Sequence, residues 1–109
     1  MRTTRKLALA VAVALAPSLA SAVELGSPKA GLAYAERVCA ECHEVQAGDS
    51  FSPNPTSPTF QEIADTPGMT ARALGVFLTT SHPTMPDIII EPGDMDNVIA
   101  YIMSLRRDR

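Results

Sequence analysis

The chain has 109 residues, which is enough for one compact domain. Its 9 basic and 12 acidic residues give a net charge of −3, which argues against a nucleic-acid-binding surface and against a polybasic membrane-binding patch. Hydrophobic residues make up 46% of the chain but aromatic residues only 5%, with no Trp. We therefore expect a small core that needs a disulfide, a metal or a cofactor to stabilise it.

The N-terminus has the pattern of a secretory signal peptide over residues 1–22. A basic head precedes an uncharged apolar run at residues 7–16, and the small residues Ala20-Ser21-Ala22 follow. Pro17 interrupts the run too early for a membrane span of about 20 apolar residues. We expect cleavage after Ala22, export of one domain at residues 23–109, and no stable insertion of that domain into a membrane. Cleavage removes cations but no acidic residue, so the exported domain is more acidic than the whole chain.

The first helix is expected to begin after the N-cap Ser27, with Pro28 in the first helical position. A glycine on the buried face of a helix indicates a close crossing with another helix, and Gly31 has that place here. The segment 48–58 contains three prolines and is predicted to be a loop. The predicted buried face of the first helix consists of Gly31, Tyr34, Ala35 and Val38.

Three further helical segments follow. Residues 60–65 favour a short helical turn, and a longer helix is expected from its N-cap at Thr70 to near Thr80. Three prolines exclude a regular helix over residues 82–92. We expect Asp94 to cap the last helix.

The last helix has an apolar face that repeats at helical spacing, and basic residues follow at its end, where cations suit the helix dipole. Residues 88–90 are strand-like but too few to build a sheet. The predicted fold class is all-α, with three or four helices and long loops. The apolar face comprises Val98, Tyr101, Ile102 and Leu105, and the basic residues are Arg106, Arg107 and Arg109.

One motif indicates the chemistry. Cys39-Ala40-Glu41-Cys42-His43 is the C-x-x-C-H pattern of covalent haem attachment. Two thiols one helical turn apart can add to the two vinyl groups on one edge of a porphyrin. His43 follows directly and can bind the iron. The motif therefore predicts one covalently attached haem c per chain, with Cys39 and Cys42 as attachment residues.

Three other interpretations of the cysteines are open. A thioredoxin-type redox pair is expected in a βαβ context, which this chain lacks. A structural zinc site needs four ligands, and only His43 and His82 remain besides the cysteines. A plain disulfide is compatible with export. We favour haem attachment, because the motif is specific and follows a signal sequence.

With this motif in place, the chain resembles the class I c-type cytochromes, especially the small bacterial periplasmic ones. Gly31 stands eight residues before Cys39, as the glycine of the family's first helix does. Residues 57–60 resemble the proline segment beside the haem, residues 85–86 the distal ligand loop, and residues 101–105 the closing helix. The resemblance implies a cytochrome c fold, with helices and long loops wrapped around one covalently bound haem, and a periplasmic location.

Met85 is the expected sixth ligand of the iron, since a thioether favours ferrous iron and raises the reduction potential. Pro86 holds it in extended backbone, and Pro83 lies just before it, so this segment cannot coil into a helix. His82 is the rival ligand, because a neutral imidazole also binds haem iron. The other methionines of the domain are Met69, Met95 and Met103, of which the last two fall in the final helix, where Met more often fills a core.

The resemblance further implies that the backbone carbonyl of Pro58 accepts a hydrogen bond from His43. Phe60 is expected either to pack on the porphyrin or to fill the core. The chain departs from the family at Ala35, where an aromatic residue is usual, and Tyr34 stands one place earlier. No arginine is obviously placed to bind a haem propionate.

The predicted function is electron transfer in the periplasm by a haem with His43 and Met85 as axial ligands, and not enzyme catalysis. The alternatives are a haem subunit of a larger oxidoreductase, a haem enzyme or gas sensor with a labile distal Met85, and a haem-free domain. The expected partners are redox proteins. The acidic charge either attracts basic docking patches on those partners or serves only solubility.

Overall fold

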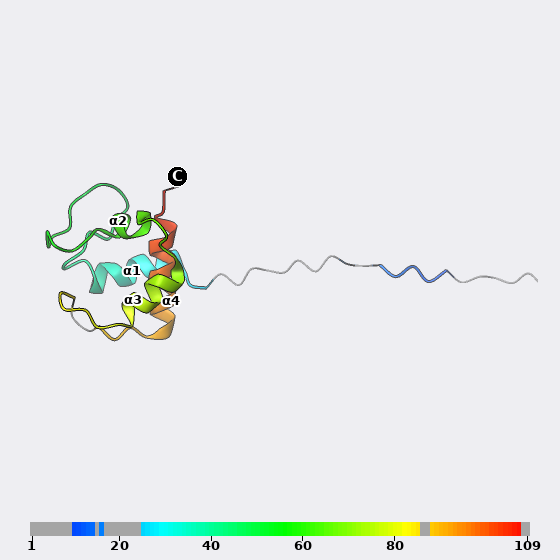
Figure 1. Cartoon of the computed structure of the whole chain (residues 1–109). Helices are drawn as coiled ribbons and strands as arrows, with labels where there is room; N and C mark the ends of the chain where they lie inside the picture. Colours follow the sequence, from blue (N-terminus) through cyan, green and yellow to red (C-terminus); the bar gives the residue numbers. More distant parts are fainter. Residues whose placement is uncertain (1–9, 15, 17–24, 86–87, 108–109) are drawn as a thin grey trace, which may run out of the picture.

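The computed structural model describes residues 10–14, 16, 25–85 and 88–107. Helices are the only regular elements of these ranges, and no strand is present within them. In chain order they are α1 (Pro28–Val38), α2 (Phe60–Asp65), α3 (Ala71–Leu78) and α4 (Pro92–Ser104), shown in Figure 1. The predicted all-α class is confirmed.

The predicted signal peptide lies mostly outside the described residues, and its cleavage stays a prediction. Its described residues, 10–14 and 16, are exposed and have no regular secondary structure. Among the helices of the described chain, none is long and apolar enough to cross a membrane.

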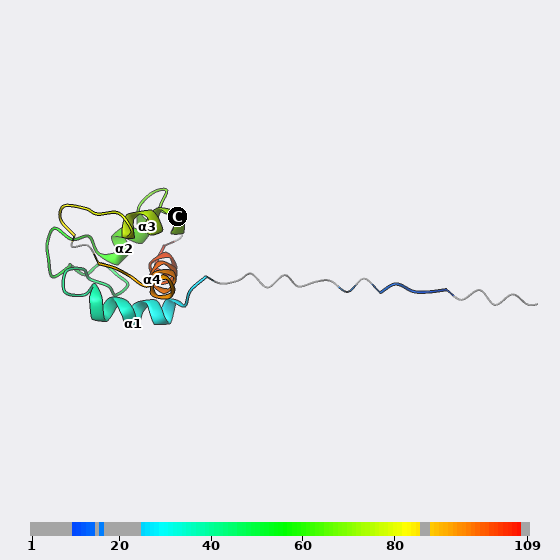
Figure 2. The same cartoon turned by 90° about the horizontal axis from the view of Figure 1, so that it is seen from below.

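Helix α4 is the centre of the arrangement. It packs most extensively against α1 and also contacts α2 and α3, whereas α1, α2 and α3 make no contact with one another in the described structure. Figure 2 shows α1 and α3 on opposite sides of the domain, with the loops that follow them extending away from α4 in the same direction. The other helices therefore all pack against α4, and the C-x-x-C-H motif and the Met85 turn lie in two separate loops, which follow α1 and α3.

Helix α1 begins as predicted. The Ser27 hydroxyl accepts a hydrogen bond from the amide of Ala30, and Pro28 occupies the first helical position. The backbone amide of Ser27 donates to the Asn97 side chain of α4 over 2.8 Å. A Cβ atom on Gly31 would stand 2.0 Å from the Asn97 carbonyl oxygen. The predicted close crossing at Gly31 is therefore confirmed, with α4 as the partner.

Helices α2 and α3 each start at a threonine cap. Thr59 and Glu62 form a capping box at α2, in which each side chain binds the backbone amide of the other residue. Thr70 caps α3 through a 3.1 Å bond from the amide of Ala73, as predicted. These bonds satisfy amides that the first helical turn leaves without partners.

The predicted start of the last helix at Asp94 is wrong. The N-cap is Glu91, three residues before Asp94; its side chain makes no capping bond, and helix α4 begins at Pro92. Proline has a backbone angle suited to the first helical position and lacks the amide that would stay unpaired there. Asp94 lies instead inside the first turn, where its charge suits the helix dipole.

The core is small and gathers around α4. Phe60 and Ala64 of α2 and Leu74 of α3 are buried, together with Val45 of the loop after the motif. Thr59 and Gln61 are the buried polar residues of the described chain. The remaining core residues come from the α1–α4 crossing and are Tyr34, Ala35, Val98, Tyr101 and Ile102.

The basic residues after α4 do more than complement its dipole, which is the only role the sequence suggested. The Arg106 guanidinium donates to the carbonyls of Ala64 and Met69. Arg107 binds Asp65 through its backbone amide at 2.9 Å and its side chain at 2.8 Å, and binds Asp49 at 3.0 Å. The C-terminal segment is therefore fastened to α2 and to the loop after the motif.

Candidate functional site

The C-x-x-C-H motif, residues 39–43, forms a tight turn directly after α1. The amides of Cys42 and His43 both donate to the carbonyl of Cys39, over 3.2 and 3.0 Å. Both cysteines are half-buried, and their thiols are not joined in a disulfide. The turn thus places Cys39, Cys42 and His43 at the C-terminal end of one helix.

Burial raises the pKa of the Cys39 thiol to about 11. A redox-active C-x-x-C pair needs the opposite, since its attacking thiol is activated by a lowered pKa. Within the described residues the surroundings are also helical, and no βαβ unit of the thioredoxin kind is present. Both observations disfavour the thioredoxin interpretation.

The His43 ring has a defined orientation. Its Nδ1 atom lies 2.6 Å from the carbonyl oxygen of Pro58, the acceptor that the resemblance implied. A carbonyl oxygen can only accept, so Nδ1 carries the hydrogen and donates. In a neutral imidazole, Nε2 is then the atom with the free lone pair, which a metal requires. Nε2 is therefore the His43 atom that could bind a metal.

The ring of Phe60 lies beside that imidazole. Its centroid is 5.7 Å from the His43 ring and 6.3 Å from the Tyr101 ring. The Tyr101 hydroxyl donates to the buried carbonyl of Val45, and burial raises the pKa of this phenol. Phe60 is a core residue in this structure, and its packing on a porphyrin stays a prediction.

The loop from residue 44 to residue 58 returns to the motif through several hydrogen bonds. The amide of Glu44 donates to the Ser52 hydroxyl over 3.0 Å, and the amide of Phe60 donates to the Glu44 carbonyl over 2.9 Å. These bonds bring the start of α2 against the residue that follows His43. The loop is thereby ordered despite its prolines.

Met85 lies in a turn of the loop that follows α3. Its backbone forms an isolated antiparallel bridge with His82, so the predicted non-helical backbone is confirmed. Residues opposite each other in such a bridge project to the same face. Met85 and His82 accordingly line one pocket of about 410 Å³, and the His82 ring lies 3.9 Å from the Phe77 ring, centroid to centroid.

A third candidate ligand lies in the same pocket. Met95, in the first turn of α4, lines it together with Met85 and His82. Met95 is not among the residues packed against the core, so its expected role as core filler is not confirmed. Met69 and Met103 do pack against the core. Sequence spacing gave no signal for this placement of Met95.

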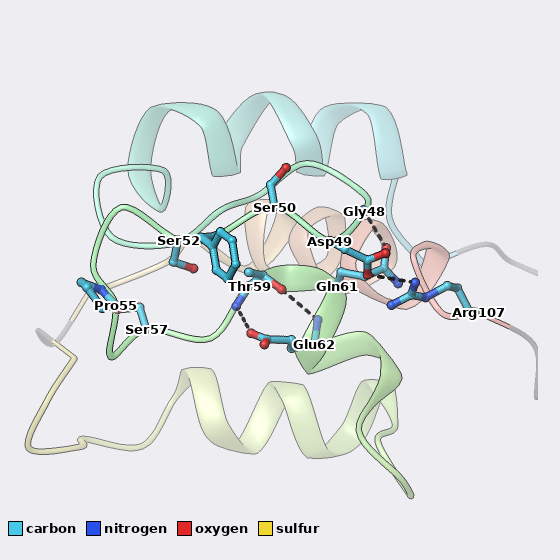
Figure 3. Close-up of a pocket in the computed structure, with 11 residues that line it drawn as sticks. Gly48, Asp49, Ser50, Ser52, Pro55, Ser57, Thr59, Gln61, Glu62 and Arg107 are labelled. Carbon is cyan, nitrogen blue, oxygen red and sulfur yellow. Dashed lines mark hydrogen bonds and ion pairs between the residues drawn. The ribbon is translucent and has the colours of Figure 1, made fainter.

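A second hollow, of about 460 Å³, lies between the loop after the motif and α2. Figure 3 shows Gln61, Glu62 and Arg107 along it, with Arg107 paired to Asp49. No cysteine, histidine or methionine lines it. The Arg107 charge is already matched by the carboxylates of Asp49 and Asp65.

The zinc interpretation finds no support in the arrangement of side chains. Within residues 10–14, 16, 25–85 and 88–107, no three His, Cys, Asp or Glu side chains gather closely enough to share a metal ion. A structural zinc site needs four such ligands. His82, the remaining candidate fourth ligand, belongs to the Met85 pocket instead.

Comparison with known proteins identifies no relative. No family model matches the chain, and no curated protein and no solved structure is significantly similar to it.

Proposed function

We propose that this chain is an exported c-type cytochrome with one haem, which carries single electrons between redox partners in the periplasm. The proposal rests mainly on the hydrogen bonding of the His43 ring. His43 completes a C-x-x-C-H motif, and its Nδ1 atom is engaged by a backbone acceptor 2.6 Å away, which leaves Nε2 for a metal. A purely structural histidine would require neither the C-x-x-C-H spacing nor a free Nε2 atom.

The other donors suit a haem as well. Cys39 and Cys42 supply two uncombined thiols at one helical turn's spacing, and Met85 supplies a thioether from a stiff turn. The haem would be held by Cys39, Cys42, His43 and Met85. A cytochrome c fold would place it between the loops that follow α1 and α3. When bound, the haem supplies one-electron chemistry by exchange between ferric and ferrous iron.

The other residues near His43 and Met85 provide apolar surroundings and take no part in a reaction. Phe60 is buried beside the His43 ring and provides apolar surface there. Leu78 and Ile90 provide apolar surface in the Met85 pocket. One electron enters and one leaves, no substrate bond is made or broken, and the polypeptide needs only to keep both ligands in place. This is the role of an electron carrier and not of an enzyme.

The test is a set of spectra of the protein purified from the periplasm of a host that attaches haem. A carrier with His43 and Met85 both bound gives a haem spectrum that changes on reduction and does not change when CO is added. Rapid and complete CO binding at neutral pH would contradict the carrier and favour a sensor or enzyme with an open sixth position.

A further inference from the structure

The segment 53–58, which supplies the acceptor for His43, is poor in hydrogen-bond donors. Pro53, Pro55 and Pro58 have no backbone N–H, so only Asn54, Thr56 and Ser57 can donate from the backbone. A loop with so few donors needs another means of fixing its shape.

The hydrogen bonds of all three backbone donors involve Asn54, either as donor or as acceptor. The Asn54 amide donates to the Cys42 carbonyl over 3.2 Å. The Thr56 amide donates to the Asn54 side-chain oxygen over 3.0 Å, and the Ser57 amide donates to the Asn54 carbonyl over 3.0 Å. The Thr56 hydroxyl adds a second bond of 2.8 Å to the same side-chain oxygen. One asparagine therefore closes the turn and joins it to the motif.

The turn is attached to the motif at both ends. At its start Asn54 is bonded to Cys42, and one residue past its end Pro58 accepts from the adjacent His43. The place of the Pro58 carbonyl relative to the imidazole is thus set by the shape of the turn between these two points. Pro58 itself is exposed, so packing does not fix it.

We propose that Asn54 is a positioning residue for His43, which acts through the 54–57 turn and the Pro58 carbonyl to set the reduction potential of the bound iron. This inference rests on the proposed function. A well-placed acceptor on Nδ1–H makes the imidazole a stronger donor through Nε2, which favours ferric over ferrous iron. Loosening the turn weakens that acceptor and raises the potential.

The experiment compares Asn54→Ala with Asn54→Ser and Thr56→Val in the haem-loaded protein. Alanine removes the side-chain acceptor, serine replaces it with a weaker one of equal charge, and valine at position 56 removes only the hydroxyl bond. The readouts are the midpoint potential, the hydrogen exchange of the His43 ring N–H in the ferrous state, and the melting temperature.

Loss of a hydrogen-bond partner of a metal-binding histidine typically lowers metal affinity or activity by about 10- to 100-fold. Since Pro58 itself remains, we expect Asn54→Ala to favour reduction by up to about tenfold, which corresponds to at most about 59 mV upward for one electron. Ring N–H exchange should be faster. Asn54→Ser should recover part of both changes, and Thr56→Val should resemble the wild type. If the alanine variant loses its haem, the serine variant provides the comparison.

Unchanged potential and ring exchange in coloured Asn54 variants, with only a lower melting temperature, would overturn the positioning role and leave the proposed function intact. A colourless wild-type protein would overturn the proposed function, and this inference with it.

Discussion

Gly31 of α1 and Asn97 of α4 lie so close that a Cβ atom added to Gly31 would stand 2.0 Å from the Asn97 carbonyl oxygen and 2.7 Å from the Tyr101 Cβ. Neither neighbour is the flexible end of a side chain, so the two helices would have to separate. This crossing is the main packing contact of the domain, because α1 meets no other helix in the described structure.

Gly31→Ala is therefore expected to destabilise the fold by about 1–3 kcal/mol, the usual cost of overpacking, although alanine is the better helix former by about 1 kcal/mol. Gly75→Ala in α3 is the matched control, because its Cβ would meet only the Ile99 side chain at 3.7 Å. The free energies of unfolding from denaturant titration check both. Equal stability of the Gly31 variant and the wild type would contradict the crossing.

Tyr101→Phe removes the hydroxyl that donates to the Val45 carbonyl and leaves that buried acceptor unpaired. The expected loss of stability is about 1–3 kcal/mol. Tyr34→Phe is the control, because no hydrogen bond of the Tyr34 hydroxyl is found among the described residues, so its loss of stability should be clearly smaller. Similar effects of the two substitutions would count against the Tyr101 bond.

Hydrogen bonds from Arg107 lower the pKa of Asp65 from 3.8 to about 2. Because the pKa is lower in the folded than in the unfolded chain, this contribution to stability is present above about pH 4 and is lost as the pH falls through 2. The melting temperatures of the wild type and Asp65→Asn should differ at pH 5 to 7 and converge toward pH 2. A difference that does not depend on pH would show that the carboxylate charge is irrelevant.

Met85→Ala is expected to abolish the weak far-red absorption that reports an iron–sulfur bond in oxidised cytochromes. Met95→Leu is the sharpest control, since Met95 lines the same pocket and leucine keeps its approximate volume. The band should survive there. Its loss in the Met95 variant and its persistence in the Met85 variant would reverse the assignment of the sixth ligand.

Local signals in the sequence predicted most of the helical structure. The caps at Ser27 and Thr70 and the crossing at Gly31 are where the sequence placed them, because each depends on a few neighbouring residues or on helical spacing. The N-cap of α4 was placed at Asp94 instead of Glu91, since an aspartate cap and a proline at the first helical position both favour a helix start.

The candidate site was less predictable where it depends on contacts distant in the sequence. The C-x-x-C-H motif indicates its own chemistry, and the acceptor at Pro58 followed from a resemblance. The contacts of Arg107 with Asp49 and Asp65 join segments 58 and 42 residues apart, and no local pattern indicates them. Asn54 was missed because its role depends on how a proline-rich loop closes.

The covalent attachment of haem is the central claim, and one mass measurement tests it most directly. Protein from the periplasm of a haem-attaching host is extracted with acidified acetone, and its intact mass is determined in the denatured state. We predict that the colour stays with the polypeptide and that the mass exceeds that of the cleaved chain by one haem, whereas Cys39→Ala/Cys42→Ala loses both. A denatured wild-type chain with the mass of the polypeptide alone, or pigment that passes into the acetone, would contradict the account.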